Sequence, residues 1–339
     1  MIVQMSRETT PEQVNKVKQF IENKGLEVKD VSSKDIFVFG IIGDTKTISA
    51  DSLKAFDGVL EVTKISTPYK KASRNFKKEN TIITLKNGLK IGDGNFVTMA
   101  GPCSVESEEQ LRIIATEVKK SGTRILRGGV FKPRTSPYAF QGLGIEGLKL
   151  MRKVADELGM AIVTELMSKE YLDDFVKYTD IIQIGARNMQ NFDLLKAVGK
   201  TKTPILLKRG ASATIEEWLM SAEYIMAGGN DNVIMCERGI RTFEKYTRNT
   251  LDISSVLAIK ELSHLPVIVD PSHAAGKWSL IEDLTLASLA VGSDGMIVEV
   301  HHKPEEALSD GAQSLKPEKY EHMMRKLEVL GTALEKKVL

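Results

Sequence analysis

Residues 161–184 read AIVTELMSKEYLDDFVKYTDIIQI, and this stretch decides the fold class. Two short apolar runs, Ala161–Glu165 and Ile181–Ile184, flank a longer segment whose apolar residues recur with a helical period. Two parallel strands need a crossover of about a dozen residues or more between them, and a helix usually provides it. The stretch therefore predicts a strand, a helix and the next parallel strand of an α/β fold.

The same alternation continues in both directions from this stretch. The runs expected as strands, each followed by a segment of helical period, are Phe96–Ala100, Arg124–Arg127, Ala161–Glu165, Ile181–Ile184, Pro204–Lys208, Asn232–Cys236, Pro266–Asp270 and Gly295–Val300. Eight such units are the number that closes a (β/α)8 barrel. We therefore predict a TIM barrel over residues 95–339.

The residues before the barrel follow a different order. Strands are expected at Ile2-Val3, Leu26–Val31, Ile36–Ile42 and Val59–Ile65, and helices at Pro11–Asn23 and Ser49–Phe56. This order, βαββαβ, predicts a small ferredoxin-like domain over residues 1–66. Residues 67–94 are expected to be a linker, flexible over Pro68–Arg74, followed by a hairpin of Thr81–Leu85 and Leu89–Ile91.

Composition excludes several classes of function. The 339 residues are 42% hydrophobic, and 47 basic and 45 acidic residues leave a net charge of +2, so neither nucleic acid nor a membrane surface is an expected partner. The start lacks the layout of a signal peptide, and no apolar run reaches the roughly 18 residues of a membrane span. We expect a cytoplasmic enzyme without a disulfide framework, since the chain has only two cysteines.

The ends of the predicted strands carry the chemistry. Active sites of such barrels are built from the loops at the carboxyl ends of the strands. The reactive or charged residues found there are, in order, Cys103, Arg127 with Lys132, Glu165, Arg187, Lys208 with Arg209, Glu237 with Arg238, Asp270 with His273, and Glu299 with His301, followed by Asp310. One charge after one strand is ordinary in a solvated loop, but convergence from eight strands favours an active site.

Four of these residues could bind a metal ion. Cys103, His273, Glu299 and Asp310 offer a thiolate, an imidazole and two carboxylates from the first, seventh and eighth strands, which become neighbours when a barrel closes. This mixed set suits a borderline divalent cation, and an open coordination position would let the ion polarise a carbonyl group. The alternative for Cys103 is a small buried apolar side chain, which is the expectation for Cys236.

Five basic residues point to an anionic substrate. They are Arg127, Lys132, Arg187, Lys208 and Arg238. Their mutual repulsion around one cavity would be costly unless a multiply charged anion were bound there. Phosphate and carboxylate groups, which arginine binds through paired hydrogen bonds, are the expected ligands.

Several motifs together resemble the 3-deoxy-D-arabino-heptulosonate 7-phosphate (DAHP) synthase family. They are Ala100–Glu106, Leu126–Pro137, Ile184–Asn188, Leu207–Gly210, Cys236–Gly239, Asp270–His273, Val298–His301 and Leu308–Gly311. The resemblance covers the barrel from about residue 95 to residue 315. The N-terminal domain is similar to that of the short type I branch of the family, in which it is regulatory.

The resemblance implies the condensation of phosphoenolpyruvate with erythrose 4-phosphate to give DAHP and phosphate, the first step of the shikimate pathway. The residue roles that it implies are metal ligands at Cys103, His273, Glu299 and Asp310, phosphoenolpyruvate contacts at Arg127, Lys132, Arg187, Lys208 and Arg238, and erythrose 4-phosphate contacts at Arg134, Thr135 and Ser136. Lys132, His273 and Cys103 are the expected catalytic residues, with Lys132 as a proton donor. Glu165 and Glu237 are both candidates for activating water.

The resemblance also implies a divalent metal ion (Mn, Fe, Zn, Co or Cd), a homotetramer and an allosteric effector, with an aromatic amino acid as the expected ligand. The alternative enzyme is 3-deoxy-manno-octulosonate 8-phosphate synthase, which uses arabinose 5-phosphate. That relative carries Lys-Ala-Asn-Arg-Ser where this chain has Lys132-Pro133-Arg134-Thr135-Ser136, so the segment favours the four-carbon sugar phosphate. A catalytically idle barrel acting as a scaffold would require losses among the matched residues, and the motifs show none.

Overall fold

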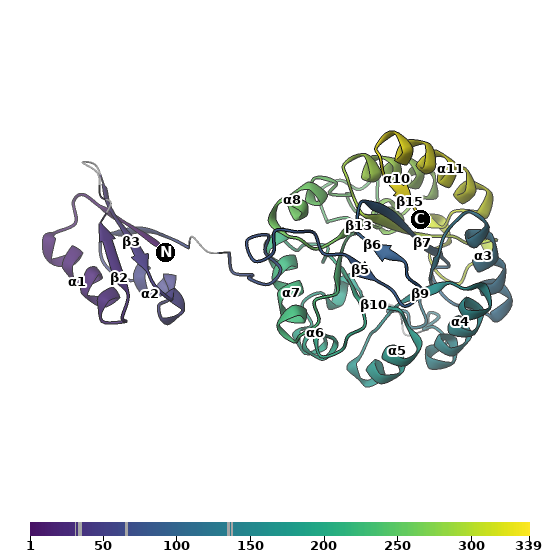
Figure 1. Cartoon of the computed structure of the whole chain (residues 1–339), viewed down its shortest axis with the longest axis horizontal. Helices are drawn as coiled ribbons and strands as arrows, with labels where there is room; N and C mark the ends of the chain where they lie inside the picture. Colours follow the sequence, from purple (N-terminus) through teal and green to yellow (C-terminus); the bar gives the residue numbers. More distant parts are fainter. Residues whose placement is uncertain (31, 33–35, 65–66, 134–135, 137) are drawn as a thin grey trace. The chain divides into compact units, whose positions relative to one another are not determined.

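The computed structural model describes residues 1–30, 32, 36–64, 67–133, 136 and 138–339. The chain divides into one unit of residues Met1–Pro68 and a second of residues Tyr69–Leu339 (Figure 1). The second unit contains every residue to which the sequence assigned chemistry.

The first unit is one antiparallel sheet with two helices. Its elements are β1 (Ile2–Ser6), α1 (Pro11–Glu22), β2 (Glu27–Asp30), β3 (Ile36–Ile42), α2 (Ala50–Lys54) and β4 (Val59–Thr63). The strand order is β2-β3-β1-β4, so the first strand pairs with both β3 and β4. Val3, Met5 and Phe39 are buried in its core with the helices. This confirms the predicted ferredoxin-like fold.

The second unit contains a closed parallel barrel. Its strands are β7 (Asn95–Gly101), β8 (Ile125–Arg127), β9 (Ala161–Glu165), β10 (Ile181–Ile184), β11 (Ile205–Lys208), β12 (Val233–Glu237), β13 (Val267–Val269) and β14 (Gly295–Glu299). Each strand pairs in parallel with the next, and β14 pairs with β7 to close the ring. The predicted (β/α)8 barrel is confirmed.

Helices surround this barrel in Figure 1. Their bounds are α3 (Glu108–Lys120), α4 (Gly144–Leu158), α5 (Leu172–Tyr178), α6 (Phe192–Gly199), α7 (Ile215–Ala227), α8 (Ser254–Leu262), α9 (Pro271–Ala275), α10 (Ile281–Ala290) and α11 (Pro317–Ala333). The short α9 was not predicted. It begins at once after β13 because Asp270 caps it, accepting a hydrogen bond from the backbone N–H of His273 at 3.0 Å.

The amino end of the barrel is closed by a hairpin of β5 (Ile83–Thr84) and β6 (Lys90–Ile91), which lies across the middle of the ring in Figure 1. Ile83 and Ile91 are buried and pack in one apolar cluster with the inward-facing residues of the strands, among them Val97 and Ile297. A short strand that was not predicted, β15 (Lys337–Val338), pairs with the start of β7 at this end. The hairpin therefore acts as an apolar plug.

The segment that precedes the hairpin is packed on the barrel. Tyr69 and Ala72 are buried, and the Glu223 carboxylate accepts hydrogen bonds from the backbone N–H groups of Lys71 (3.1 Å) and Ala72 (2.9 Å). Arg74 donates to the carbonyl of Lys260 at 2.9 Å. The expectation of a flexible connector was therefore wrong for residues 69–74, because buried side chains and side-chain caps fix them.

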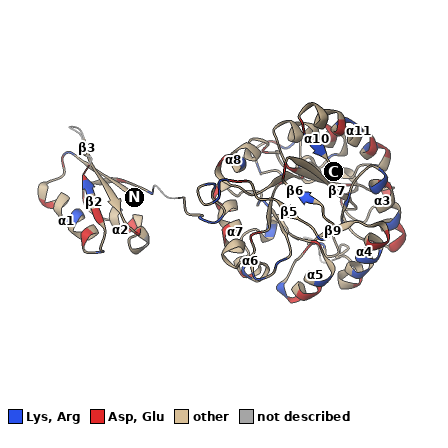
Figure 2. Cartoon of the chain, viewed as in Figure 1, with Lys and Arg blue, Asp and Glu red and all other residues tan. Residues whose placement is uncertain are grey.

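The outer surface mixes charges of both signs. Figure 2 shows basic and acidic residues on the same helices, for example α3, α4 and α11. Among the residues that the structure describes, no helix combines the length and apolar character needed to cross a membrane.

Candidate active site

A cavity of about 800 Å3 lies at the carboxyl ends of the barrel strands, lined by the loops that follow them. Its charged or titratable lining residues are Lys132, Glu165, Arg187, Lys208, Glu217, Arg238, Arg241, Arg248, His273 and Asp310. This volume is within the range of small-molecule sites. The excess of cations makes it a cavity for anions.

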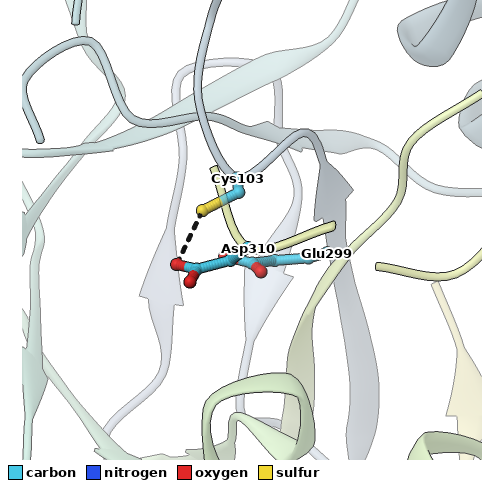
Figure 3. Close-up of side chains that lie close together, drawn as sticks. All are labelled: Cys103, Glu299 and Asp310. Carbon is cyan, nitrogen blue, oxygen red and sulfur yellow. Dashed lines mark hydrogen bonds between the residues drawn. The ribbon is translucent and has the colours of Figure 1, made fainter. Parts of the chain in front are cut away.

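Three of the predicted metal ligands meet beside this cavity. One ligand atom each from Cys103, Glu299 and Asp310 lies within 4.8 Å of the other two. Figure 3 shows the three side chains close together. The thiol of Cys103 is 3.3 Å from Oδ2 of Asp310. Cys103 and Glu299 are each 1% exposed, whereas Asp310 is partly exposed and also lines the cavity. These residues form a candidate metal site.

His273, the fourth predicted ligand, lies next to this group. Its Nε2 is 3.5 Å from Oε1 of Glu299, and its Nδ1 is 2.8 Å from Oδ2 of Asp270. Asp270 also forms a buried ion pair with Lys208. Burial lowers the pKa of His273 despite the nearby carboxylates, so the imidazole is neutral, as a metal ligand must be.

The protonation states of the other ligands fit a cation. Burial, helped by the charge of Glu299, raises the pKa of the Cys103 thiol to about 12. Burial opposes ionisation of Glu299 as well, but the neighbouring His273 and the positive charges of Arg127 and Lys132 lower its pKa below the usual value, so this carboxylate is ionised. The thiol would therefore lose its proton when a cation binds, and the donor set fits a divalent metal ion.

The loop that carries Asp310 has an unusual backbone. Asp310 has a φ of 50°, in the left-handed region that aspartate and asparagine enter more often than most other residues. At Gly311 an added Cβ would lie 2.0 Å from the carbonyl oxygen of Pro304, so no larger residue fits. The backbone beside Asp310 is therefore tightly packed.

Four of the five predicted phosphoenolpyruvate contacts line the cavity: Lys132, Arg187, Lys208 and Arg238. The fifth, Arg127, is 5% exposed and lies outside the lining. Its Nη1 donates to Oε1 of Glu299 and to the carbonyl of Pro102, both at 2.9 Å. The structure therefore places Arg127 against a metal ligand, a contact that strand order alone could not reveal.

The cavity cations differ in how they are compensated. The Nζ atom of Lys132 is 3.0 Å from the sulfur of Cys103. Burial opposes the charge of Lys132, but the neighbouring Cys103 and Glu299 raise its pKa, so the amine stays protonated. Arg238 is 8% exposed, and its side chain makes no hydrogen bond or ion pair with another described residue. Burial lowers the pKa of Arg238, and a bound anion would compensate its charge.

The two candidate carboxylates for activating water lie in different environments. Glu165 lines the cavity and accepts a hydrogen bond from Gln183 at 3.2 Å. Any side chain at Gly185 would collide with it, since an added Cβ would lie 2.0 Å from Oε1 of Glu165. Glu237 is fully buried outside the lining, paired with Arg209 at 3.0 Å.

Other predicted residues are placed as follows. Ser136 lines the cavity and is exposed, whereas Arg134 and Thr135 lie outside the described residues. Cys236 is fully buried in the inner apolar cluster of the barrel, as expected. His301 is buried, with Nε2 3.7 Å from Oε2 of Glu106, and does not line the cavity.

The sequence reasoning missed Arg241, Arg248 and Asn249 of the cavity lining, and Gln313 behind it. The first three lie in the connection between β12 and α8, which contains no long apolar run. Its length was the available signal, because long loops at the carboxyl end of a barrel are usually functional. Gln313 is neutral and follows no strand directly, so nothing in the pattern marked it.

Two kinds of aldolase are similar to this chain, and one of them matches it over its whole length. A phospho-2-dehydro-3-deoxyheptonate aldolase of Thermotoga maritima is 49% identical over 338 residues, covering 100% of both sequences. A 2-dehydro-3-deoxyphosphooctonate aldolase of Geobacter sulfurreducens is 31% identical over 271 residues, covering 75% of this chain and 97% of the relative. The second kind of enzyme therefore matches at lower identity and over less of the chain.

Solved structures give the same result. The crystal structure of the Thermotoga maritima enzyme, described as DAHP synthase, has a TM-score of 0.95 at 48% identity and covers 100% of this chain and 99% of its own. A truncated form from the same organism covers 79% of this chain and 98% of its own, with a TM-score of 0.74 at 50% identity. Residues 1–67 match the DAHP synthase ferredoxin-like domain. Residues 80–336 match the DAHP synthetase I family, and the chain belongs to that family.

Proposed function

We propose that this chain is a metal-dependent DAHP synthase, which condenses phosphoenolpyruvate with erythrose 4-phosphate and releases phosphate. The observation that carries the proposal is the position of the group of Cys103, Glu299 and Asp310 at the edge of a cavity with excess positive charge. One end of the cavity can hold a cation, and the rest can hold the anionic groups of two phosphorylated substrates.

Phosphoenolpyruvate would bind where the basic side chains converge. Arg187 and Arg238 are suited to its phosphate and carboxylate groups, because a guanidinium group can form paired hydrogen bonds with either. Arg238 supports this assignment most strongly, since it is buried and its side chain makes no hydrogen bond or ion pair with another described residue. Arg127 remains a proposed phosphoenolpyruvate contact, and it also holds Glu299.

The aldehyde of the sugar phosphate would lie near the candidate metal site. A bound divalent ion supplies Lewis-acid polarisation of that aldehyde, with Cys103, His273, Glu299 and Asp310 as its ligands. Mn, Fe, Zn, Co and Cd are all compatible with this donor set, and reconstituting the metal-free protein with each ion would rank them. Arg134, Thr135 and Ser136 remain the proposed contacts for the phosphate of the sugar.

Proton transfers can be assigned to two residues. Lys132 is held protonated by its neighbours and lines the cavity, so it can donate a proton to the reacting sugar oxygen. We favour Glu165 over Glu237 as the base that accepts a proton from water, because Glu165 lines the cavity and Glu237 is already paired with Arg209.

Turnover with erythrose 4-phosphate against arabinose 5-phosphate tests the substrate assignment. We expect phosphate release that depends on phosphoenolpyruvate, with the four-carbon sugar strongly preferred. Equal or better turnover of arabinose 5-phosphate would favour 3-deoxy-manno-octulosonate 8-phosphate synthase instead.

We also propose that the N-terminal unit regulates a cytoplasmic homotetramer, with an aromatic amino acid such as tyrosine or phenylalanine, or a later pathway intermediate, as effector. A truncation tests this. It should begin at Tyr69, because Tyr69 and Ala72 are buried in the barrel unit and a start at Arg74 would remove them. The truncated barrel should keep its activity and lose inhibition; an intact enzyme that ignores all these effectors at millimolar concentration would exclude the regulatory role.

A further inference from the structure

Gln313 lies between a candidate metal ligand and a cavity residue. Its side chain is almost fully buried, with the residue 3% exposed. Its Nε2 donates a hydrogen bond to Oε2 of Glu299 at 2.8 Å, and its Oε1 accepts one from Nη1 of Arg248 at 2.9 Å. The same Nη1 of Arg248 lies 3.5 Å from Oδ1 of Asp310. One amide group thus connects Glu299 with an arginine that also touches Asp310.

The chemistry of these partners allows one orientation of the amide. A guanidinium group only donates hydrogen bonds and an ionised carboxylate only accepts them. The carbonyl of Gln313 must therefore face Arg248, and its NH2 group must face Glu299. Reversing the amide would place two donors together at one end and two acceptors at the other, so Arg248 fixes the orientation of Gln313.

Glu299 is held from several sides, and Gln313 provides the contact at one of its two carboxylate oxygens. Arg127 binds Oε1, and Gln313 binds Oε2. The backbone N–H of Glu299 donates to the Ser272 hydroxyl at 3.0 Å, which fixes the main chain. Rotation of the carboxylate is therefore limited by Arg127 and Gln313 together.

We propose that Gln313 is a positioning residue, which holds the Glu299 carboxylate in the orientation needed for the metal ion, and that Arg248 keeps the amide of Gln313 in place. The inference rests on the proposed metal role of Cys103, Glu299 and Asp310. Gln313 directly follows the turn that carries Asp310, since the short helix Gly311–Gln313 begins at the next residue. One turn thus supplies a ligand and the support for another ligand.

Two substitutions test the proposal by calorimetric titration of the metal-free protein with Mn2+. Gln313→Met keeps the length of the side chain and removes both hydrogen bonds, whereas Gln313→Asn keeps the amide but is too short to span from Arg248 to Glu299. We expect each to weaken Mn2+ binding by about 10- to 100-fold, the usual effect of losing a residue that orients a metal ligand. At saturating Mn2+, most of kcat should return and the KM for phosphoenolpyruvate should stay unchanged.

Asn230→Leu is the matched control. Asn230 lies just before the amino end of β12 and is fully buried. Its side-chain amide donates a hydrogen bond to the carbonyl of Thr203 at 2.8 Å. Its loss should lower the unfolding temperature and leave Mn2+ affinity within twofold of wild type. If Gln313 had a purely structural role, its substitutions would likewise lower the unfolding temperature and leave Mn2+ affinity unchanged.

The outcomes separate the inference from the proposed function. If wild-type protein binds Mn2+ and both Gln313 variants bind it equally well, the positioning role is refuted while the metal site stands. The same conclusion follows if Asn230→Leu weakens binding as much as they do. If wild-type protein binds no divalent cation, the metal-dependent function itself fails, and with it the inference.

Discussion

The two ends of the barrel are made from the same strands but from different kinds of residue. At the amino end, the hairpin plug of β5 and β6 buries Ile83 and Ile91 against inward-facing apolar side chains. At the carboxyl end, the same strands lead into buried ionisable residues such as Lys208 and Asp270 around an open cavity. Burying a charged group costs free energy, whereas burying an apolar side chain does not. The comparison therefore predicts that substitutions at the amino end chiefly lower stability, and that substitutions at the carboxyl end chiefly lower activity.

The largest effect should follow from loss of a candidate metal ligand. Cys103→Ala should lower kcat by more than the roughly 10- to 100-fold expected for an outer-shell partner, because a ligand atom itself is lost. EDTA should abolish wild-type activity, and a divalent ion should restore it. Steady-state kinetics of metal-free and reconstituted protein measure both.

The second cysteine offers the matched control for this change. Cys236→Ala should leave kcat unchanged and cost about 1 kcal/mol of unfolding free energy, since Cys236 is fully buried in the inner apolar cluster. Full activity of thoroughly demetallated wild-type protein would contradict the metal role.

At the carboxyl end, we expect Lys132 and Arg134 to serve different steps of the reaction. Lys132→Ala should lower kcat by about 10²- to 10⁴-fold, because it removes a proton donor as well as a charge. Arg134→Ala should chiefly raise the KM for erythrose 4-phosphate. Initial rates with each substrate varied in turn would show the split, and equal effects of both changes on both substrates would disprove it.

At the amino end, Ile91→Ala should cost about 2–5 kcal/mol of unfolding free energy, the usual range for deleting a large buried aliphatic side chain. The kinetic constants at 25 °C should remain those of wild type, because the plug lies at the end opposite the cavity. Urea unfolding and initial rates measure the two effects. A large change in KM without a loss of stability in Ile91→Ala would contradict the assignment of stability to the amino end and chemistry to the carboxyl end.

The smallest expected effect concerns pH. His264 is buried, with Nδ1 2.8 Å from the Thr81 hydroxyl and Nε2 2.7 Å from the carbonyl oxygen of Lys71, and burial lowers its pKa below the ordinary value near 6.5. The unfolded chain therefore binds a proton more readily than the folded chain does, so this contribution to stability is present above about pH 6.5 and is lost as the pH falls.

Unfolding of wild type and His264→Gln between pH 5 and 8 tests this prediction. The wild-type free energy should fall more steeply with acidification, by up to about 1.4 kcal/mol per pH unit for one extra proton. Parallel curves for the two proteins would mean that His264 is not responsible.

The sequence predicted the barrel well because the same pattern, a short apolar strand followed by a helical segment, occurs eight times. Strands such as Ala161–Glu165 and Ile181–Ile184 are mostly apolar and are separated by a segment of helical period, and their bounds agree with the structure. Short elements lack such a signal: β15 has two residues and pairs with a strand more than 200 positions earlier. Tyr69 and Ala72 lie in a polar segment, and only the barrel surface shows what buries them.

The sequence could predict which residues of the candidate site lie close together, because the order of the strands determines which strand ends are neighbours. Cys103 and Glu299 come from β7 and β14, which are far apart in the sequence and paired in the closed barrel, so their meeting follows from closure. Side-chain direction does not follow from strand order. The hydrogen bond from Arg127 to Glu299 was therefore not foreseen, and neither was the contact of the Gln313 amide with the same carboxylate.

The left-handed turn at Asp310 restricts the residues that could ever occupy this position. Asparagine would tolerate the backbone but lack the negative charge, whereas glutamate would carry the charge on a backbone it rarely adopts. Glycine would relieve the strain and leave no ligand. Aspartate combines an anionic ligand with a tendency to enter this backbone region, so in a library with all substitutions at residue 310 aspartate should be the most frequent residue among active variants.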